Sequence, residues 1–266
     1  MRKPLRLTPS PREKVWGRKR LAPWFPDCGR DIGEVWFLAE EELPLLVKLL
    51  FTSEKLSIQV HPDDGEGVTR GKTEMWHILE AEPGAQIALG FRRPITRERL
   101  REACWTGEIE ELVNWFPVKA GETYFTPAHT VHAIGAGIVL CEIQQHSDVT
   151  YRLWDYGRPR EMHLDQGIAV ADTGLHPGCS HPSPIEPGRD LLVRSRHFVT
   201  EALCLPAGVK YTPSPERCQL FVVVEGRGAI GDQPIETGEV WHVPQEADRA
   251  LVNTESGIRL LRTYAP

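Results

Sequence analysis

Hydrophobic and polar residues alternate over short stretches in much of this chain, a pattern typical of half-buried β-strands. In LSIQVHPDD, Leu56, Ile58 and Val60 alternate with a serine, a glutamine and a histidine. Similar stretches, bounded by glycine and proline, predict strands at residues 34–38, 46–52, 56–61, 75–80, 86–91, 123–127, 137–144, 150–154, 191–193, 198–205, 219–224, 239–243, 250–253 and 258–263. So many short strands predict a mainly β protein, built as a sandwich or barrel.

One stretch departs from this pattern. From Thr96, TRERLREACWTGEIEELVNWF has apolar residues at helical spacing, and Thr96 is a suitable N-cap. Gly107 is expected to divide the stretch into two short helices. We therefore expect a helical insertion at about residues 96–116.

Two distant segments resemble each other. GETYFTPAHTVHAI begins at Gly121 and GEVWHVPQEADRAL at Gly238, and both have proline at the seventh position. At the twelfth position the first has His132 and the second has Arg249. A glycine turn, a strand, a bend and a returning strand are similar to the second conserved stretch of cupin jelly-roll barrels. The histidine at this point of a cupin binds metal, so the second copy is expected to lack a metal site.

A change of composition separates the two copies. ADTGLHPGCSHPSPIEPGR, at residues 171–189, is rich in proline, glycine, serine and histidine, as expected for a linker. The sequence thus predicts two cupin-type jelly-roll β-barrels with a short helical insertion. Residues 1–170 would form a catalytic barrel and residues 190–266 a second, metal-free one.

Composition and charge narrow the function classes. The chain has 266 residues, of which 41% are hydrophobic, and a formal net charge of -6. Such a balance argues against a nucleic-acid partner, because phosphate backbones are bound by basic surfaces. No apolar run is long enough to span a bilayer, and the basic start lacks the apolar segment of a signal peptide. The six cysteines include no C-x-x-C pair, so we expect reduced thiols in a cytoplasmic protein.

Four polar residues could form a metal site. Strand alternation puts Gln59 and His61 on one face, Glu74 opens the next predicted strand, and His132 comes from a later segment. Two imidazoles, a carboxylate and an amide oxygen form a suitable ligand set for Zn²⁺ or a similar divalent ion. Spacing alone does not distinguish this set from unrelated strand residues.

Four motifs carry a resemblance to a known family. LSIQVHPDD, GKTEMWHIL, PAHTVHAI and EIQQHSDVTYRLWDYGRP closely resemble, in order, the short bacterial form of the type I phosphomannose isomerases, over most of residues 10–165. The resemblance implies one Zn²⁺ per chain, held by Gln59, His61, Glu74 and His132. It also implies interconversion of mannose 6-phosphate and fructose 6-phosphate through an enediol(ate).

That reaction needs a proton carrier and cations beside a developing oxyanion. The resemblance favours Lys72 and Arg152 as catalytic groups that also bind the substrate. Glu142, expected to point into the barrel, is the first choice for acid–base work, and Ser57 could donate a hydrogen bond to the phosphate. From the residues alone, Lys72 could equally be a solvated lysine, Arg152 an arginine stacked on the barrel rim and Ser57 a serine on the strand surface.

Two functions remain open beside this one. The chain could isomerise a different aldose phosphate, because the loop between His61 and Glu74 is shorter than in many relatives. It could also be a non-catalytic cupin that binds a sugar phosphate. His129 replaces a usually small residue and is expected at a loop or rim, whereas His77 is expected to be structural. Either a monomer or a homodimer is compatible with the sequence.

Overall fold

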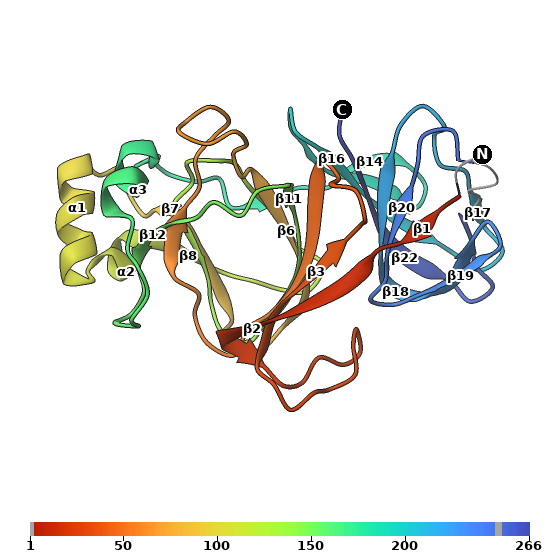
Figure 1. Cartoon of the computed structure of the whole chain (residues 1–266), viewed down its shortest axis with the longest axis horizontal. Coiled ribbons are helices and arrows are strands. Elements are labelled where there is room, and N and C mark those ends of the chain that lie inside the picture. The colour runs from red at the N-terminus through yellow and green to blue at the C-terminus, as the bar shows by residue number, and fades with distance from the viewer. Residues whose placement is uncertain (1–2, 248–251) are drawn as a thin grey trace.

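The computed structural model describes residues 3–247 and 252–266, and antiparallel strands dominate it. Figure 1 shows an elongated molecule with the helices at one end and the C-terminal strands at the other. Within the described residues the strands form three sheets. A five-stranded sheet has the order β12 (Tyr151–Trp154), β5 (Ile58–Val60), β10 (His132–Ile134), β7 (Gln86–Phe91) and β8 (Val113–Pro117).

The other two sheets are larger. A seven-stranded sheet has the order β13 (Cys179–Ser180), β9 (Thr123–Thr126), β6 (Glu74–Ala81), β11 (Ile138–Gln145), β4 (Leu45–Phe51), β3 (Ile32–Leu38) and β2 (Thr8–Arg18). A ten-stranded sheet has the order β1 (Leu5–Arg6), β20 (Val240–Val243), β18 (Gln219–Ile230), β22 (Ile258–Tyr264), β16 (Val199–Leu205), β15 (Arg189–Arg194) and β14 (Ser183–Glu186), with β17 (Lys210–Tyr211), β19 (Gln233–Glu236) and β21 (Val252–Asn253) attached.

The seven-stranded sheet is covered on both faces. Toward the five-stranded sheet it packs Trp76, Ile78 and Leu140 against Ile87 and Leu89, and these two sheets form what we call the first barrel. Its other face packs against the ten-stranded sheet, which we call the second barrel and which encloses a core of its own. The arrangement is therefore three layers of sheet, with the seven-stranded sheet in the middle.

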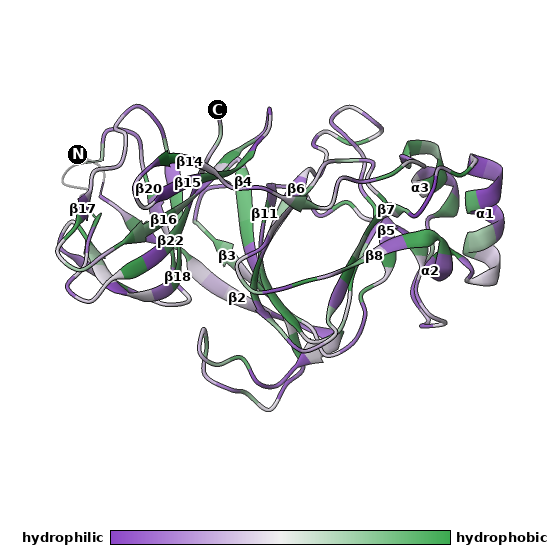
Figure 2. Ribbon diagram, turned by 180° about the vertical axis from the view of Figure 1, so that it is seen from behind, coloured by the Kyte–Doolittle hydropathy of each residue, from purple (hydrophilic) through white to green (hydrophobic). Residues whose placement is uncertain are grey.

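Strand β4 reflects this central position. Its sequence LLVKLLF is buried at every residue, because alternate side chains enter two different cores. Leu45, Val47 and Leu49 pack in the core between the two barrels, whereas Leu50 packs inside the first barrel. Figure 2 shows β4 mostly in green, as a hydrophobic strand, whereas β2 is pale purple.

The helical insertion is shorter than predicted. Thr96 caps α1 (Arg97–Thr106) by accepting a hydrogen bond from the amide of Arg99, and Gly107 ends it with a φ of 83°. Helix α2 (Ile109–Leu112) follows, but the chain then enters β8, which pairs with β7. The helical pattern expected to reach residue 116 thus ends at Leu112, because pairing with the sheet edge decides the conformation of Val113–Pro117.

Other predictions can be compared directly. Each predicted strand overlaps an observed one. Strand β2 was not predicted because it contains two prolines, which it accommodates as the outermost strand of its sheet. Helix α3 (Leu164–Val170) was also not predicted. Arg249 lies outside the described residues.

The segments near the expected domain boundaries are paired with both barrels. Strand β1 pairs with β20 of the second barrel, so the N-terminal segment crosses from one barrel to the other. Within residues 171–189, β13 pairs with β9 of the first barrel and β14 with β15 of the second. Among the described residues, no helix is both long and apolar enough to cross a bilayer.

Candidate metal centre

The five-stranded sheet aligns three polar residues in one row. Gln59 on β5 is the direct partner of His132 on β10 and of Arg152 on β12. Directly opposed residues of antiparallel strands point to the same face of the sheet. The three side chains therefore share the face that is turned toward the seven-stranded sheet, from which Glu74 approaches at the start of β6.

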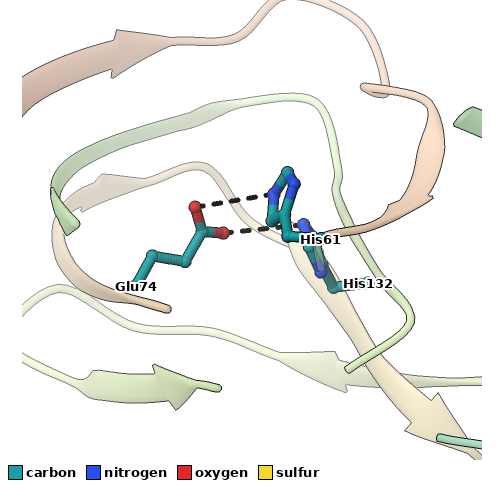
Figure 3. Close-up of side chains that lie close together, drawn as sticks. All are labelled: His61, Glu74 and His132. Carbon is teal, nitrogen blue, oxygen red and sulfur yellow. Dashed lines mark ion pairs between the residues drawn. The ribbon is translucent and has the colours of Figure 1, made fainter. Parts of the chain in front are cut away.

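His61, Glu74 and His132 meet inside the first barrel. Their potential ligand atoms lie within 4.8 Å of one another. Oε1 of Glu74 is 3.5 Å from Nε2 of His132, and Oε2 is 3.7 Å from Nε2 of His61. Figure 3 shows the carboxylate facing both imidazoles. All three side chains are fully buried, so this cluster is sheltered from bulk water.

Backbone carbonyls orient both imidazoles. Nδ1 of His61 is 2.8 Å from the carbonyl oxygen of Val149, and Nδ1 of His132 is 2.8 Å from that of Thr130. A carbonyl only accepts, so Nδ1 carries the proton and the Nε2 lone pair faces Glu74. Burial lowers the pKa of His61 well below its ordinary value and the pKa of His132 to about 3. Both rings are therefore neutral, as metal ligation requires.

Glu74 and Gln59 give two further observations on this place. Oε1 of Glu74 is buried and has no hydrogen-bond partner among the described residues. An unpartnered buried carboxylate oxygen is costly unless something cationic binds it. The side-chain nitrogen of Gln59 lies 3.3 Å from Nε2 of His132, so its amide group borders the same cluster. The residues present thus fit a divalent cation.

Charges of opposite sign alternate beside the cluster. Nζ of Lys72 contacts Oε2 of Glu74, lies 3.1 Å from Nε2 of His61 and lies 3.5 Å from Oε1 of Glu142. Nζ of Lys48 lies 3.2 Å from the same Glu142 oxygen. Each of these four ionisable side chains is at most 5% exposed. Alternation compensates them in a place where a single buried charge would be unstable.

This alternation sets the protonation states. Burial opposes the charge of Lys72, but Glu142 and Glu74 raise its pKa above the ordinary value. Burial would raise the pKa of Glu142, but Lys72 and Lys48 outweigh it and lower the pKa to about 2. For Glu74, burial and the charge of Glu142 prevail over Lys72 and raise the pKa to about 7. Glu142 is therefore ionised at neutral pH.

The remaining predicted site residues border this cluster less directly. Ser57 is buried and its hydroxyl donates to Oε1 of Gln59 at 3.0 Å. Arg152 lies beside Gln59 in register, and its Nη1 donates to the carbonyl oxygen of Glu161 at 2.6 Å. Its Nε is buried without a hydrogen-bond partner among the described residues.

Two residues that contact Glu142, Lys48 and Trp76, were not predicted as site residues from the sequence. Lys48 pairs with Glu142, and its ammonium lies 4.4 Å from the ring centre of Trp36. Trp76 donates to Oε2 of Glu142 at 3.2 Å and meets the His132 ring edge to face. The signal for Lys48 was present, because a lysine in the middle of LLVKLLF is the only polar residue of a buried strand.

His129 and His77, for which the sequence predicts no ligand role, lie where they were expected. His129 has a φ of 74° in a loop, and its Nε2 is 2.7 Å from Glu66. His77 points to the opposite face of β6, where its Nδ1 is 2.9 Å from the hydroxyl of Thr123. A second group of potential ligands, Asp63, Asp64 and His197, is partly exposed.

Comparison with known proteins identifies the relatives. A model of the family "Phosphomannose isomerase type I, catalytic domain" matches residues 27–89. A mannose-6-phosphate isomerase of Streptococcus mutans is 34% identical over 223 residues, which are 65% of this chain and 69% of the relative. The mannose-6-phosphate isomerase ManA of Bacillus subtilis is 41% identical over 146 residues, or 51% of this chain and 46% of the relative.

Solved structures show the same fold. The crystal structure of the mannose 6-phosphate isomerase from Bacillus subtilis superimposes with a TM-score of 0.88 at 24% identity, covering 99% of this chain and 100% of that one. A structure described as a mannosephosphate isomerase from Archaeoglobus fulgidus has a TM-score of 0.80 at 16% identity, covering 98% of this chain and 97% of that one. This chain thus shares its mainly β fold with these structures over nearly its whole length.

Proposed function

Because the chain belongs to the type I phosphomannose isomerase family, we propose that it interconverts mannose 6-phosphate and fructose 6-phosphate. The buried cluster of His61, Glu74 and His132 beside the ammonium of Lys72 is the observation that supports this most. Moving a carbonyl between C1 and C2 requires removal of a proton from carbon, and negative charge then develops on oxygen. A dry site with cations and neutral imidazoles suits that chemistry.

The metal is proposed to be a single Zn²⁺ held by Gln59, His61, Glu74 and His132. Nitrogen and oxygen donors of this kind are ordinary ligands of zinc in enzymes. A half turn of the Gln59 amide would direct its oxygen, in place of its nitrogen, toward Nε2 of His132. When bound, the ion would act as a Lewis acid that polarises the sugar carbonyl.

Two cations are proposed to hold the substrate. Lys72 is buried, and Glu142 and Glu74 raise its pKa, so at neutral pH its ammonium can donate to an oxygen on which negative charge develops. Arg152 presents an unpartnered buried Nε on the face that carries Gln59, which suits a substrate oxyanion or phosphate. Ser57 is the proposed donor to the phosphate; its hydroxyl donates to Gln59, so it would have to rotate to reach a substrate.

Glu142 is proposed to carry the proton between the two carbons. Its carboxylate is ionised and inside the barrel, so it can accept a proton. A pKa of about 2 makes it a weak base while both lysines compensate its charge. When a substrate oxygen engages Lys72, the attraction between that lysine and Glu142 is reduced. The basicity of Glu142 then rises at the step that needs it.

A coupled assay tests the activity. Mannose 6-phosphate is supplied to the metal-loaded protein, and fructose 6-phosphate formation is followed by coupling enzymes that reduce NADP⁺. We expect turnover that a strong chelator abolishes and that Zn²⁺ restores. A panel of other aldose phosphates serves as the comparison. Preference for another sugar would favour an isomerase of that sugar, and binding without turnover of any sugar would favour a sugar-phosphate-binding cupin.

The second barrel is proposed to hold no metal. Two groups of potential metal ligands occur among the described residues. The group of His61, Glu74 and His132 lies in the first barrel, and the second group combines His197 with Asp63 and Asp64 of the first barrel, so neither group lies wholly within residues 190–266. Elemental analysis should therefore give one metal ion per chain. Two ions per chain would contradict this assignment.

A further inference from the structure

The second barrel contacts the first at the loop between His61 and Lys72. The guanidinium of Arg196 forms an ion pair with Oδ2 of Asp63. The ring of His197 lies 3.8 Å from Asp63 and 3.9 Å from Asp64, measured between nitrogen and carboxylate oxygen. Both residues belong to the turn that precedes β16. Two adjacent residues of the second barrel thus face the two aspartates that directly follow the metal-ligand segment.

This turn is held firmly in the second barrel. The hydroxyl of Ser195 accepts hydrogen bonds from the amides of His197 and Phe198, at 3.1 and 3.0 Å. The ring of Phe198 is fully buried in the core between the barrels and meets the ring of Phe125 edge to face. The turn is therefore a fixed support against which the loop of the first barrel can be held.

Asp64 connects this turn to the segment that carries Lys72. Its Oδ1 accepts from the backbone amide of Gly71 at 2.7 Å and from the side-chain amide of Gln145 at 2.9 Å. Gln145 in turn accepts, through Oε1, from the backbone amide of Thr73 at 2.8 Å. The backbone amide of Lys72 donates to the carbonyl of Pro62 at 3.0 Å.

Three consecutive amides, those of Gly71, Lys72 and Thr73, are thus bonded by groups of the adjoining loop and of β11. Gly71 fits only without a side chain, because a Cβ there would lie 2.5 Å from the backbone of Asp63. The backbone of Lys72 has little freedom, and its ammonium reaches His61 and Glu74 from a fixed origin.

We propose that Arg196 and His197 of the second barrel, acting through Asp63 and Asp64, are positioning residues for Lys72. This inference rests on the proposed function insofar as it concerns turnover, but the placement of Lys72 can be measured without it. It gives the second barrel a role in the reaction that does not require a metal of its own. An error of about 1 Å in the placement of a group at the reacting atoms can lower the rate by about 100-fold.

Three variants and a control test the proposal. Arg196→Gln combined with His197→Asn removes the guanidinium and the imidazole that face Asp63 and Asp64, and puts a smaller, uncharged polar side chain at each position. Asp64→Ala removes the acceptor of Gly71 and Gln145, whereas Asp64→Asn keeps an oxygen there. Arg227→Gln is the matched control, because Arg227 pairs with Glu236 on an exposed hairpin of the second barrel.

The first readout is independent of activity. Lys72 is 4% exposed, so an amine-reactive reagent followed by peptide mass spectrometry should modify it slowly in the native protein and in the control. In the Arg196→Gln/His197→Asn and Asp64→Ala variants we expect modification at least about 10-fold faster. Labelling of Lys72 at the native rate in both variants would overturn the proposal, whatever the assay shows.

The second readout is kinetic. With metal content and thermal midpoint measured in parallel, kcat should fall by about 10- to 100-fold in Asp64→Ala and KM should change less than about 3-fold. Asp64→Asn should recover most of kcat.

If the native protein turned over no sugar phosphate, the proposed function would fail, and labelling would still test the placement of Lys72. Should Asp64→Ala not fold, the Arg196→Gln/His197→Asn variant decides, because Arg196 is exposed and His197 is partly exposed.

Discussion

Lys48 and Glu142 are direct partners across strands β4 and β11, and Nζ of Lys48 lies 3.2 Å from Oε1 of Glu142 inside the first barrel. Lys72 approaches the same oxygen at 3.5 Å. One carboxylate is thus shared by two buried lysines. Through Glu142, Lys48 in the middle of β4 is linked to Lys72, which contacts the candidate ligands Glu74 and His61. Removing any member of this group should change the others.

Lys48→Met should destabilise the protein more than a surface substitution does. Glu142 would lose one of its two cationic partners and stay buried, so we expect the free energy of unfolding to fall by roughly 2–3 kcal/mol. Urea unfolding of the metal-free protein measures this. Adding Glu142→Leu to Lys48→Met should cost less than the sum of the single changes. Fully additive losses would show that the two side chains do not interact.

Glu142→Gln should keep the metal and lose turnover. The amide retains the shape of the carboxylate but cannot take a proton, so kcat should fall by about 100- to 10,000-fold. Elemental analysis should still find one ion per chain, because Glu142 is not among the proposed ligands. Normal turnover in this variant would mean that another group moves the proton.

His132→Ala should lose metal and isomerisation together. The imidazole supplies one of the proposed ligands, and its removal also leaves Glu74 with one histidine neighbour instead of two. Metal analysis after dialysis and the coupled assay should decline in parallel, with a loss of activity of at least about 100-fold. His77→Asn is the control, since His77 lies on β6 of the seven-stranded sheet, on the face opposite to Glu74. Full activity of the native protein after chelation would contradict the metal assignment.

His77 should make stability depend on pH below neutrality. Burial lowers the pKa of His77 to about 4 in the folded protein, against 6.5 in the unfolded chain. Between these values the unfolded chain binds more protons, so the free energy of unfolding falls as the pH falls from 6.5 toward 4. The contribution of this residue is roughly 3 kcal/mol when complete.

Asn at position 77 can keep the hydrogen bond to Thr123 and has no such proton to bind. Comparing urea unfolding of His77→Asn with the native protein at pH 7 and pH 5, both without metal, cancels the contributions of the other histidines. We expect the native protein to lose more stability over this interval than the variant does. Equal losses would show that His77 is not responsible.

Much of the fold can be read from the sequence because its signals are local. Alternating positions predict the strands, Thr96 predicts the helix start, and Gly107 predicts the break between α1 and α2. The four motifs point to the ligand candidates Gln59, His61, Glu74 and His132. These inferences need only side-chain type and spacing, which the chain carries by itself.

Tertiary structure decided the features that depend on distant partners. Residues 113–116 have a helical pattern but belong to strand β8, because β7 offers an edge to pair with. Proline-containing β2 is a strand because it lies at an edge, where the missing amide donors cost little. Lys48 became part of the site only when β4 and β11 placed it opposite Glu142, since no local pattern tells which charges will share a buried interior.

The same holds for the contact between the barrels. The sequence by itself determined the strand pattern, the two-barrel class and the candidate ligands. It did not determine that Arg196 and His197 would lie against Asp63 and Asp64, which are more than a hundred positions away along the chain. Such long-range contacts depend on how the sheets pack, and packing is decided by the fit of whole surfaces rather than by the identity of neighbouring residues.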